Sequence, residues 1–468
     1  MQFWDNVGPL DLLVIAMLLV VARVVTTGLP MLRRLALPPA LVAGATGMAL
    51  GPAFLDVLPV ETASLETVVY HCLALLYISM ALQAVPKGRA SHGARSITFG
   101  IPVIILLQGA LGLIFVVGWT STVADLHPGF GLMLALGFSQ GPGQALALGA
   151  SWEPTGFVNG GQAGLLMAAL GYAWCSVVGV SLFHLGRRAG WHRSGGQSET
   201  DVEDHQTAAE RPAPLPGDLD ALTSQAALVG FVYLLVWGLL TVVTAQLADE
   251  KLVARLWGFH FIFALALSIG ARRLMELAGV HDRVVDDELQ SRLSGFIIDA
   301  AAVCAIAAVR VDLLADLLAP AVALAVIGGG FTTVLTLWLC RRAFPERPFA
   351  HALLLFGTVT GTLPTGLVLL RLEDPALRTT AARNVIMGMP GVVVLTVPLI
   401  LVVLPIPVAD WPGSYPGAVW LAIGICLAYA AALMVAWRFV GALRPVGSAA
   451  SIWPAEAHAL EATAERSG

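Results

Sequence analysis

Apolar runs of about twenty residues recur along the whole chain, and this repetition constrains the fold more than any other feature of the sequence. The first run, LDLLVIAMLLVVARVVTT, begins at Leu10. A helix of about twenty residues is about 30 Å long, which is the thickness of the hydrocarbon core of a bilayer. Only 12% of the residues are charged and 57% are hydrophobic, whereas soluble domains have about 25% charged residues. The sequence therefore predicts an all-α polytopic membrane protein embedded in a lipid bilayer.

A polar segment divides the predicted spans into two series. Residues 187–222 are rich in Gly, Ser, Glu and Pro, so they are predicted to form a flexible linker. The spans before it are predicted at 10–27, 39–57, 66–84, 97–119 and 160–186. The spans after it are predicted at 223–247, 256–276, 294–312, 318–340, 381–405 and 417–440.

Two further apolar segments are interrupted by residues that break helices. The segment 130–150 carries SQGPGQ at its centre, and the segment 349–370 carries TGTLPTG. Each follows four spans and precedes a fifth. Because five is an odd number, the second series enters the membrane from the opposite side, as in the inverted-topology repeats of secondary transporters. The predicted organisation is one repeat over 1–186, a second over 223–405, and an extra helix with a polar tail over 406–468.

The positions of Lys and Arg distinguish interrupted segments that cross the membrane from segments that fold back. If both are re-entrant hairpins and the N-terminus lies outside, 22 of the 26 Lys and Arg residues are cytoplasmic and three are outside. If both are kinked spanning helices, the division is 14 to 11. Cytoplasmic loops carry an excess of Lys and Arg. The sequence therefore favours hairpins, with the N-terminus outside and the linker and C-terminus in the cytoplasm.

A helix that is broken near the membrane midplane has backbone groups free to bind a ligand. Helix N-termini suit a carboxylate, and free carbonyl and hydroxyl oxygens suit a hard cation such as Na⁺. Ser and Thr can also simply cap the local breaks. The candidate substrate-binding residues at the breaks are Ser139, Gln140, Gly141, Gly143, Gln144, Thr362, Pro364, Thr365 and Gly366. The candidate ion-coupling residues are Ser139, Thr358, Thr360, Gly361 and Thr365, with a possible Na⁺ site at Ser139, Thr360 and Thr365.

The residues at the breaks also carry a resemblance to a known family. The stretch 139–145, SQGPGQA, keeps Ser139, Gly141 and Gly143 of a Ser-Gly-Gly-His-Gly-Thr-Gly pattern. The stretch GFVN at 156–159 is similar to Gly-Phe-Thr-Asn, and GTLPTG at 361–366 is similar to Gly-Ala-Thr-Pro-Thr-Ala. These patterns, in this order, are those of the bacterial sodium/glutamate symporter family, which the chain resembles over most of residues 10–405.

The resemblance implies a fold of two inverted repeats whose hairpin tips meet at a central substrate site. It also implies Na⁺ as the coupling ion, glutamate as the substrate, a homodimer, and a place in the bacterial inner membrane. Through it, Asn159 and Gln162 join the candidate substrate-binding residues. The chain departs from the family at Pro142, Gln144 and Gln162, where the family has histidine, threonine and glutamate. Its Pro398 and Leu401 stand where the family has polar residues.

Asp299 is a charged residue inside a predicted span. Because the span is predicted to begin at 294, Asp299 is either a solvated interfacial residue or a site that binds an ion or a proton. Arg23, near the end of the first span, is expected to extend to the interface. His71 and His260 are expected to pack inside the protein.

The sequence features together predict a secondary transporter. The expected substrate is a small anion, with glutamate first, and the expected mechanism is sodium-coupled symport by alternating access. A proton-coupled transporter or exchanger of another small organic anion, or a channel with re-entrant loops, are the alternatives. No enzyme motif occurs in the sequence, and no cofactor and no nucleic-acid partner are expected.

Overall fold

The computed structural model describes residues 8–28, 38–84, 91–191, 219–344, 347–374, 377, 379–409, 412–440 and 443. Within these ranges the chain forms helices and turns, without a strand. Nine of the described helices are long and apolar enough to cross a membrane, or ten if a bent helix pair counts as one span. The described part of the chain is therefore all-α, and its long apolar helices are those of an integral membrane protein with several spans. Most of the predicted linker, and the polar tail after Arg444, lie outside the described residues.

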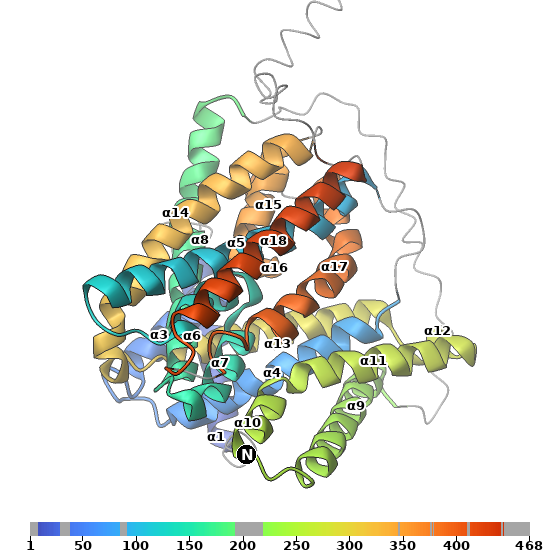
Figure 1. The fold of residues 1–468 in the computed structure, drawn as a ribbon. Coiled ribbons are helices and arrows are strands. Elements are labelled where there is room, and N and C mark those ends of the chain that lie inside the picture. Colours follow the sequence, from blue (N-terminus) through green and yellow to red (C-terminus); the bar gives the residue numbers. More distant parts are fainter. Residues whose placement is uncertain are drawn as a thin grey trace, which may run out of the picture.

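The helices follow the predicted order (Figure 1). Before the linker they are α1 (Pro9–Gly28), α3 (Pro39–Leu50), α4 (Thr62–Leu82), α5 (His92–Thr122) and α8 (Gly160–Arg188). After the linker they are α9 (Ala221–Thr244), α10 (Glu250–Gly258), α11 (His260–Leu277), α13 (Asp287–Ala307), α14 (Ala315–Ala343), α17 (Thr380–Pro398) and α18 (Gly417–Phe439). The short helix α12 (His281–Val284) connects α11 to α13.

Three of the predicted spans differ clearly from the helices that form there. Helix α3 ends at Leu50, before Gly51 and Pro52, because the residue before a proline disfavours the helical conformation and glycine is a weak helix former. The span predicted at 256–276 is the pair α10–α11, which is bent by 54°. Helix α13 begins seven residues before the predicted span, at Asp287. The Asp286 side chain caps it by accepting hydrogen bonds from Glu288 N and Leu289 N, both at 3.1 Å.

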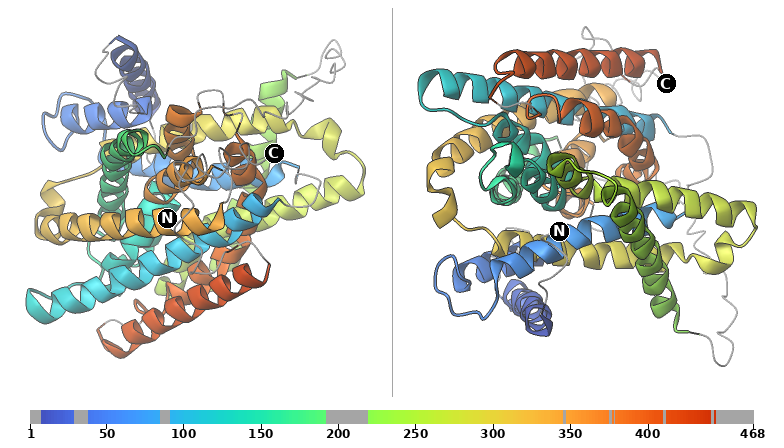
Figure 2. Two further views of the ribbon diagram at one scale, coloured as in Figure 1. Left: turned by 90° about the horizontal axis from the view of Figure 1, so that it is seen from above. Right: turned by 60° about the horizontal axis from the view of Figure 1, so that its bottom comes forward.

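The two series of helices pack against each other in reciprocal pairs. Helices at the same position in the two series are called counterparts. Helix α4 packs against α11, and its counterpart α13 packs against α3. In the same way α5 packs against α17, and its counterpart α14 packs against α8. The counterparts also meet directly, α4 with α13 and α5 with α14. One group thus contains α3, α4, α11 and α13, and the other contains α5, α8, α14 and α17 (Figure 2).

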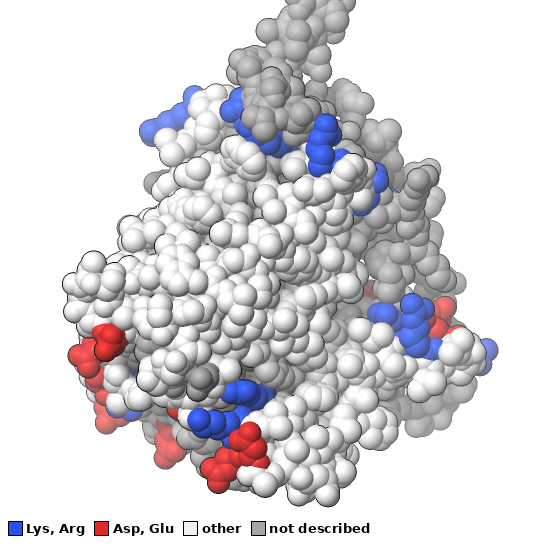
Figure 3. Space-filling view, viewed as in Figure 1, with Lys and Arg blue, Asp and Glu red and all other residues white. Residues whose placement is uncertain are grey.

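Charged residues collect at the ends of the helices. Figure 3 shows a broad face without charge, with Lys and Arg along its upper edge and both basic and acidic residues at its right and lower edges. Basic residues lie in the last turns of α8 and α14, at Arg187, Arg188, Arg341 and Arg342. This uncharged face is what a chain surrounded by lipid requires.

The two interrupted segments fold back on themselves. Hairpin 1 (128–151) consists of α6 (Pro128–Met133), the π-helical turn η1 (Leu134–Gln140) and α7 (Pro142–Ser151). Hairpin 2 (348–373) consists of α15 (Pro348–Thr360) and α16 (Leu363–Glu373). Helix α7 packs on η1, and α16 packs on α15. A Cβ on Gly366 would lie 2.4 Å from the Leu354 carbonyl oxygen, so only glycine allows the arms of hairpin 2 this close. Each segment is therefore a hairpin and not a kinked continuous helix.

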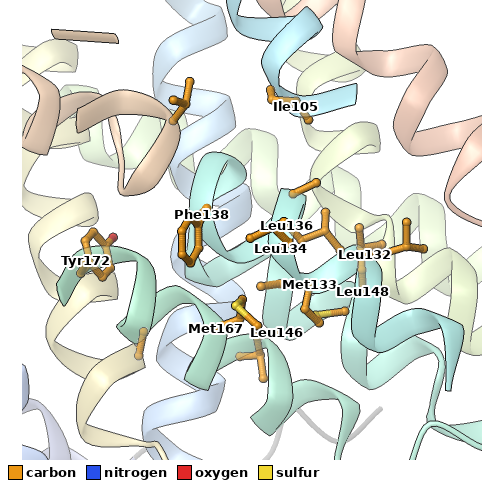
Figure 4. Close-up of a cluster of buried hydrophobic side chains, with 14 of the residues drawn as sticks. Ile105, Leu132, Met133, Leu134, Leu136, Phe138, Leu146, Leu148, Met167 and Tyr172 are labelled. Atoms are coloured by element: carbon orange, nitrogen blue, oxygen red, sulfur yellow. The ribbon is translucent and has the colours of Figure 1, made fainter. Parts of the chain in front are cut away.

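Hairpin 1 is surrounded by apolar side chains (Figure 4). Leu134, Leu136 and Phe138 from one arm, and Leu146 and Leu148 from the other, are buried. Gly137 lies directly against α8, where an added Cβ would be 2.8 Å from the Ala168 nitrogen. The apolar halves of the predicted segment thus hold the polar centre in place inside the protein.

Candidate functional site

The tips of the two hairpins lie against each other. The Ser139 hydroxyl lies 2.8 Å from the Val359 carbonyl oxygen of hairpin 2 and 2.5 Å from Gln108 Oε1, and its one proton can be donated to either. A Cβ on Gly141 would lie 3.4 Å from Thr362 Cγ2. The structure therefore brings together the two interrupted segments that the sequence identified, although more than 200 residues separate them.

Gln108 joins four elements at this point. It lies within the apolar helix α5 and is completely buried. Its Nε2 donates hydrogen bonds to the Val359 carbonyl oxygen and to Thr332 Oγ1 of α14, both at 3.0 Å. A buried amide retains its position only if it is hydrogen-bonded, so Gln108 fixes the two hairpins relative to α5 and α14. Gln108 is not among the residues predicted from the sequence. The feature that could have indicated it is a single amide within the apolar stretch VIILLQGALG.

The break in hairpin 1 depends on one glycine. Gly141 has φ = 88°, a conformation that residues with a Cβ rarely adopt. It ends the π-helical turn, and Pro142 then starts α7 at its first position, where the missing N–H costs nothing. The first-turn N–H groups of α7, at Gly143 and Gln144, therefore point toward the break.

Gln140 and Gln144 leave polar atoms without hydrogen bonds. Gln144 Nε2 donates to Tyr77 Oη of α4 at 2.5 Å and to Gln140 Oε1 at 3.3 Å. Gln144 is 1% exposed, yet its Oε1 and the Nε2 of Gln140 are buried without a partner. Exchanging O and N in both amides preserves the contact and again leaves one donor and one acceptor. An unmade buried hydrogen bond costs about 1–3 kcal/mol, so this cluster is suited to a polar ligand.

Hairpin 2 satisfies its own polar groups. Thr358 and Thr360 donate to carbonyl oxygens one turn earlier, at 2.8 and 2.6 Å. Thr365 Oγ1 accepts from Thr362 N at 2.8 Å, and its proton can reach the Gly357 carbonyl oxygen at 2.8 Å. Thr362 and Thr365 form a capping box at the start of α16. The capping alternative that the sequence left open thus describes the threonines of this hairpin.

The three hydroxyls of the expected Na⁺ site lie beside carbonyls near the C-terminal end of α15. Ser139, Thr360 and Thr365 each lie beside a different carbonyl of α15, namely those of Val359, Phe356 and Gly357. A hydroxyl that donates to a carbonyl retains lone pairs for a cation, and hard cations prefer such oxygen ligands. Among the described residues, no group of His, Cys, Asp or Glu side chains could hold a metal ion.

Asp299 lies further from the start of its helix than the sequence predicted. It is twelve residues from the start of α13 at Asp287, or about 18 Å along the helix axis. On the neighbouring face of α13, Ile297 and Ala300 pack on Cys72 of α4, whereas Asp299 is exposed. Because the first turns of α13 are charged, both alternatives for Asp299, an interfacial residue and a site for an ion or a proton, stay predictions.

Asn159 and Gln162 lie at a different place. They line a cavity of about 580 Å³ together with Glu66, Glu153 and Arg310. Gln162 Nε2 donates to Glu66 Oε1 and to the Ala308 carbonyl oxygen. Tyr172 contacts hairpin 2, because a Cβ on Gly361 would lie 3.3 Å from its Cδ1. It is ten residues further along α8 than Gln162, or about 15 Å. The structure thus divides the predicted site residues between the hairpin tips and this second cavity.

The second cavity carries mostly acidic side chains. Asp56, Glu61, Glu66 and Glu153 line it, and Arg310 is the basic residue among its lining. Arg310 pairs with Asp312, with Nε 2.8 Å from Oδ1. Burial raises the pKa of Glu153, although N–H groups of Gly161 and Gly160 oppose the rise. This cavity favours cations, so it does not resemble a site for the expected anion.

Comparisons with known proteins returned no match. No protein-family model matches the chain, and no curated protein and no solved structure matches it. The resemblance given above therefore depends on the quoted motifs alone.

Proposed function

We propose that the chain is a secondary active transporter that carries a small carboxylate together with Na⁺ by alternating access. The observation that carries this proposal is the meeting of two hairpin tips, Ser139 on Val359, inside a helical membrane protein. Discontinuous helices that meet inside the membrane are typical of transporter substrate sites. Glutamate, the substrate of the family that the chain resembles, is the first substrate to test.

The substrate carboxylate would lie at the tips, beside the N-terminus of α7. Partial positive charge at a helix N-terminus favours an anion, and the break places Gly143 and Gln144 there. Na⁺ would bind the hydroxyl and carbonyl oxygens of Ser139, Thr360 and Thr365. Gly361 and Gly366 keep the backbone of hairpin 2 compact around this point.

The reciprocal packing supports two inverted repeats. An internal two-fold axis would relate the pair α4–α11 to α13–α3, and α5–α17 to α14–α8. The charge distribution supports a cytoplasmic side at the basic ends of α8 and α14, and in that orientation the N-terminus would lie outside. A bacterial inner membrane and a homodimer follow from the resemblance and belong to the same proposal.

Alternating access would move one helix group past the other. Hairpins 1 and 2 pack with α5, α8 and α14, and α7 of hairpin 1 also contacts α4 and α13 of the other group. Movement of the hairpin-containing group would expose the tips to each side of the membrane in turn.

Uptake into proteoliposomes tests the proposal. Purified full-length protein would be reconstituted and given labelled L-glutamate with an inward Na⁺ gradient, or with a proton gradient at equal Na⁺. Saturable accumulation that requires the Na⁺ gradient, and that is lost in Thr365→Ala, is the expected result. Accumulation with the proton gradient alone would indicate proton coupling. Flux that does not saturate would indicate a channel.

A further inference from the structure

Three polar side chains form a strip beside the hairpin tips. Gln140 ends the π-helical turn of hairpin 1, Gln144 lies in the first turn of α7, and Tyr77 lies on α4. Gln144 bonds to both of the others. The strip continues to hairpin 2, because Gly141 follows Gln140 and a Cβ on it would lie 3.4 Å from Thr362 Cγ2. Both glutamines therefore lie where the two tips meet.

The Gln140–Gln144 pair has one hydrogen-bond donor and one acceptor left over. Gln144 Oε1 and Gln140 Nε2 are buried without a partner, and Gln144 is 1% exposed. The same count results if O and N are exchanged in both amides. Buried polar groups are nearly always hydrogen-bonded, so the pair indicates a ligand group that donates one hydrogen bond and accepts another.

A small molecule can reach this strip. Gln140, Tyr77 and Thr362 each retain part of their surface, as does Pro364 in the first turn of α16. The two arms of hairpin 1, by contrast, are buried. The accessible part of hairpin 1 is therefore its break, where the glutamines lie.

The surroundings of the tips offer little positive charge. Hairpin 1 packs on α4, α5 and α8, and hairpin 2 packs on α8 and α14. Lys, Arg, Asp and Glu are absent from both hairpins and from these helices over 67–82, 97–119, 128–151, 160–186, 317–340 and 348–370. Of the other helices that contact α7, α10 meets it at Ser151, about 13 Å along the helix from Pro142. Arg292 of α13 is paired with Glu288 at 2.6 Å.

The breaks provide one uncapped helix N-terminus and not two. Helix α16 is closed by the capping box of Thr362 and Thr365. Helix α7 has no side-chain cap, because its N-cap residue is Gly141. A helix N-terminus carries about half an elementary positive charge. The tips therefore suit one carboxylate, at the start of α7, and a second carboxylate would lack a basic partner from the surrounding helices.

We propose that the Gln140–Gln144 pair binds a carboxamide group of the substrate, so that the transporter selects monocarboxylates with an amide end over dicarboxylates of equal length. An ionised carboxylate only accepts hydrogen bonds, whereas a primary amide both donates and accepts. The amide would use the donor and the acceptor of the pair together, but a second carboxylate would use the donor alone. The inference rests on the proposed function, since it takes the hairpin tips as the substrate site, and it adds the second polar group of the substrate.

Two matched pairs of probes test the inference, namely L-glutamine with L-glutamate and glutaramate with glutarate. Within each pair an amide replaces one carboxylate, and the second pair has no amino group. Binding to purified full-length protein in detergent, at saturating Na⁺ and neutral pH, would be measured for wild type, Gln144→Met, Gln140→Met and Gln246→Met. Gln246, exposed just after α9, is the control amide. Gel filtration and melting curves would establish that each variant is folded.

Wild type is expected to bind the amide at least tenfold more tightly than the dicarboxylate in each pair that binds. Gln144→Met should weaken both members, the amide more strongly, and bring them to similar affinities. Gln140→Met should do the same, and Gln246→Met should retain the preference. Equal binding within a pair, a preference for the dicarboxylate, or no binding of any of the four probes to wild type would overturn the inference without a variant.

The failures of the two proposals are distinguishable. Na⁺-driven uptake of L-glutamate or glutarate by a protein that shows no preference for the amides would leave the proposed function and remove the inference. Preferential binding of the amides without Na⁺-driven uptake of any probe would retain the inference and remove symport. If folded Gln140→Met and Gln144→Met both keep the wild-type preference, another part of the site selects the substrate and the inference is wrong.

Discussion

Hairpin 1 and hairpin 2 occupy matching places in the chain, but they stabilise their breaks in different ways. Hairpin 2 uses threonine hydroxyls, and the capping box of Thr362 and Thr365 satisfies its backbone from within. Hairpin 1 uses a positive-φ glycine and a proline, and leaves amide atoms of Gln140 and Gln144 without partners. The difference indicates that hairpin 1 retains unused hydrogen-bonding capacity for a polar ligand, whereas the threonine hydroxyls of hairpin 2 are already hydrogen-bonded within the hairpin.

The largest effect is expected where the arms of hairpin 2 touch. In Gly366→Val the new Cβ would lie 2.4 Å from Thr358 Oγ1 and from the Leu354 carbonyl oxygen. Overpacking of this kind costs about 1–3 kcal/mol or more, so the melting temperature in detergent should fall strongly. Gly330→Val is the matched control, because nothing lies within 4 Å of its added Cβ. Equal melting temperatures for the two variants would contradict the close packing of the arms.

Removal of the capping hydroxyl should have a smaller effect on stability. Thr365→Val keeps the shape of the side chain but loses the bonds to Thr362 N and Gly357 O. Loss of a helix cap costs about 0.5–2 kcal/mol, and Thr365→Ser should recover most of it. Thermal unfolding of the three proteins in detergent measures the effect. A Thr365→Val protein as stable as wild type would show that hairpin 2 does not depend on its own cap.

Acid should weaken the entry to hairpin 1 through His127. This histidine caps α6 by accepting from Gly129 N at 3.0 Å, and burial lowers its pKa to about 4. The unfolded chain, with a pKa of about 6.5, then binds more protons between these values. Stability from this group is therefore complete above pH 6.5 and is lost as the pH falls toward 4.

At pH 5 the loss from His127 should be about 1–2 kcal/mol. The measurement is the melting temperature at pH 7 and pH 5 for wild type and His127→Asn, which retains a capping side chain. The variant should show a smaller shift between the two pH values. An identical shift in both proteins would exclude His127 as its source.

The smallest effect on stability is expected at Gln144. Gln144→Met removes an Oε1 that is buried without a partner, which offsets the lost hydrogen bond from Nε2 to Tyr77 Oη, so the melting temperature should change by little. Binding of L-glutamate to the purified protein in detergent, at saturating Na⁺, should nevertheless weaken about tenfold. A protein that melts much lower and binds normally would reverse the distinction between the hairpins.

The membrane class and the two interrupted segments could be read from the sequence because they depend on hydropathy and on residues that break helices. The order of the helices was predictable for the same reason. The start of α13 was not, since the polar first turns from Asp287 conceal a helix whose cap is Asp286. Asp299 therefore lies twelve residues into its helix, further than the span predicted from 294 implied.

The candidate site was only partly predictable. Ser139 and the threonines of hairpin 2 were identified because breaks can be recognised locally. Gln108 and Tyr172 are single polar residues on apolar helices, and only tertiary packing brings them to the tips. Asn159 and Gln162 were assigned through a resemblance, and the packing of α8 places them at the second cavity instead.

The central claim is that the two tips form one site whose movement carries the substrate. Gly141→Cys together with Thr362→Cys tests it most directly, because a Cβ at 141 would lie 3.4 Å from Thr362 Cγ2. Uptake by the reduced Gly141→Cys protein measures separately what a Cβ costs at this positive φ. The native cysteines Cys72, Cys175, Cys304, Cys340 and Cys426 are all buried and unpaired. The account predicts that mild oxidation cross-links the double variant and stops Na⁺-driven uptake, that reduction restores uptake, and that each single variant is unaffected by the oxidant. Failure to cross-link, or full uptake by the cross-linked protein, would contradict it.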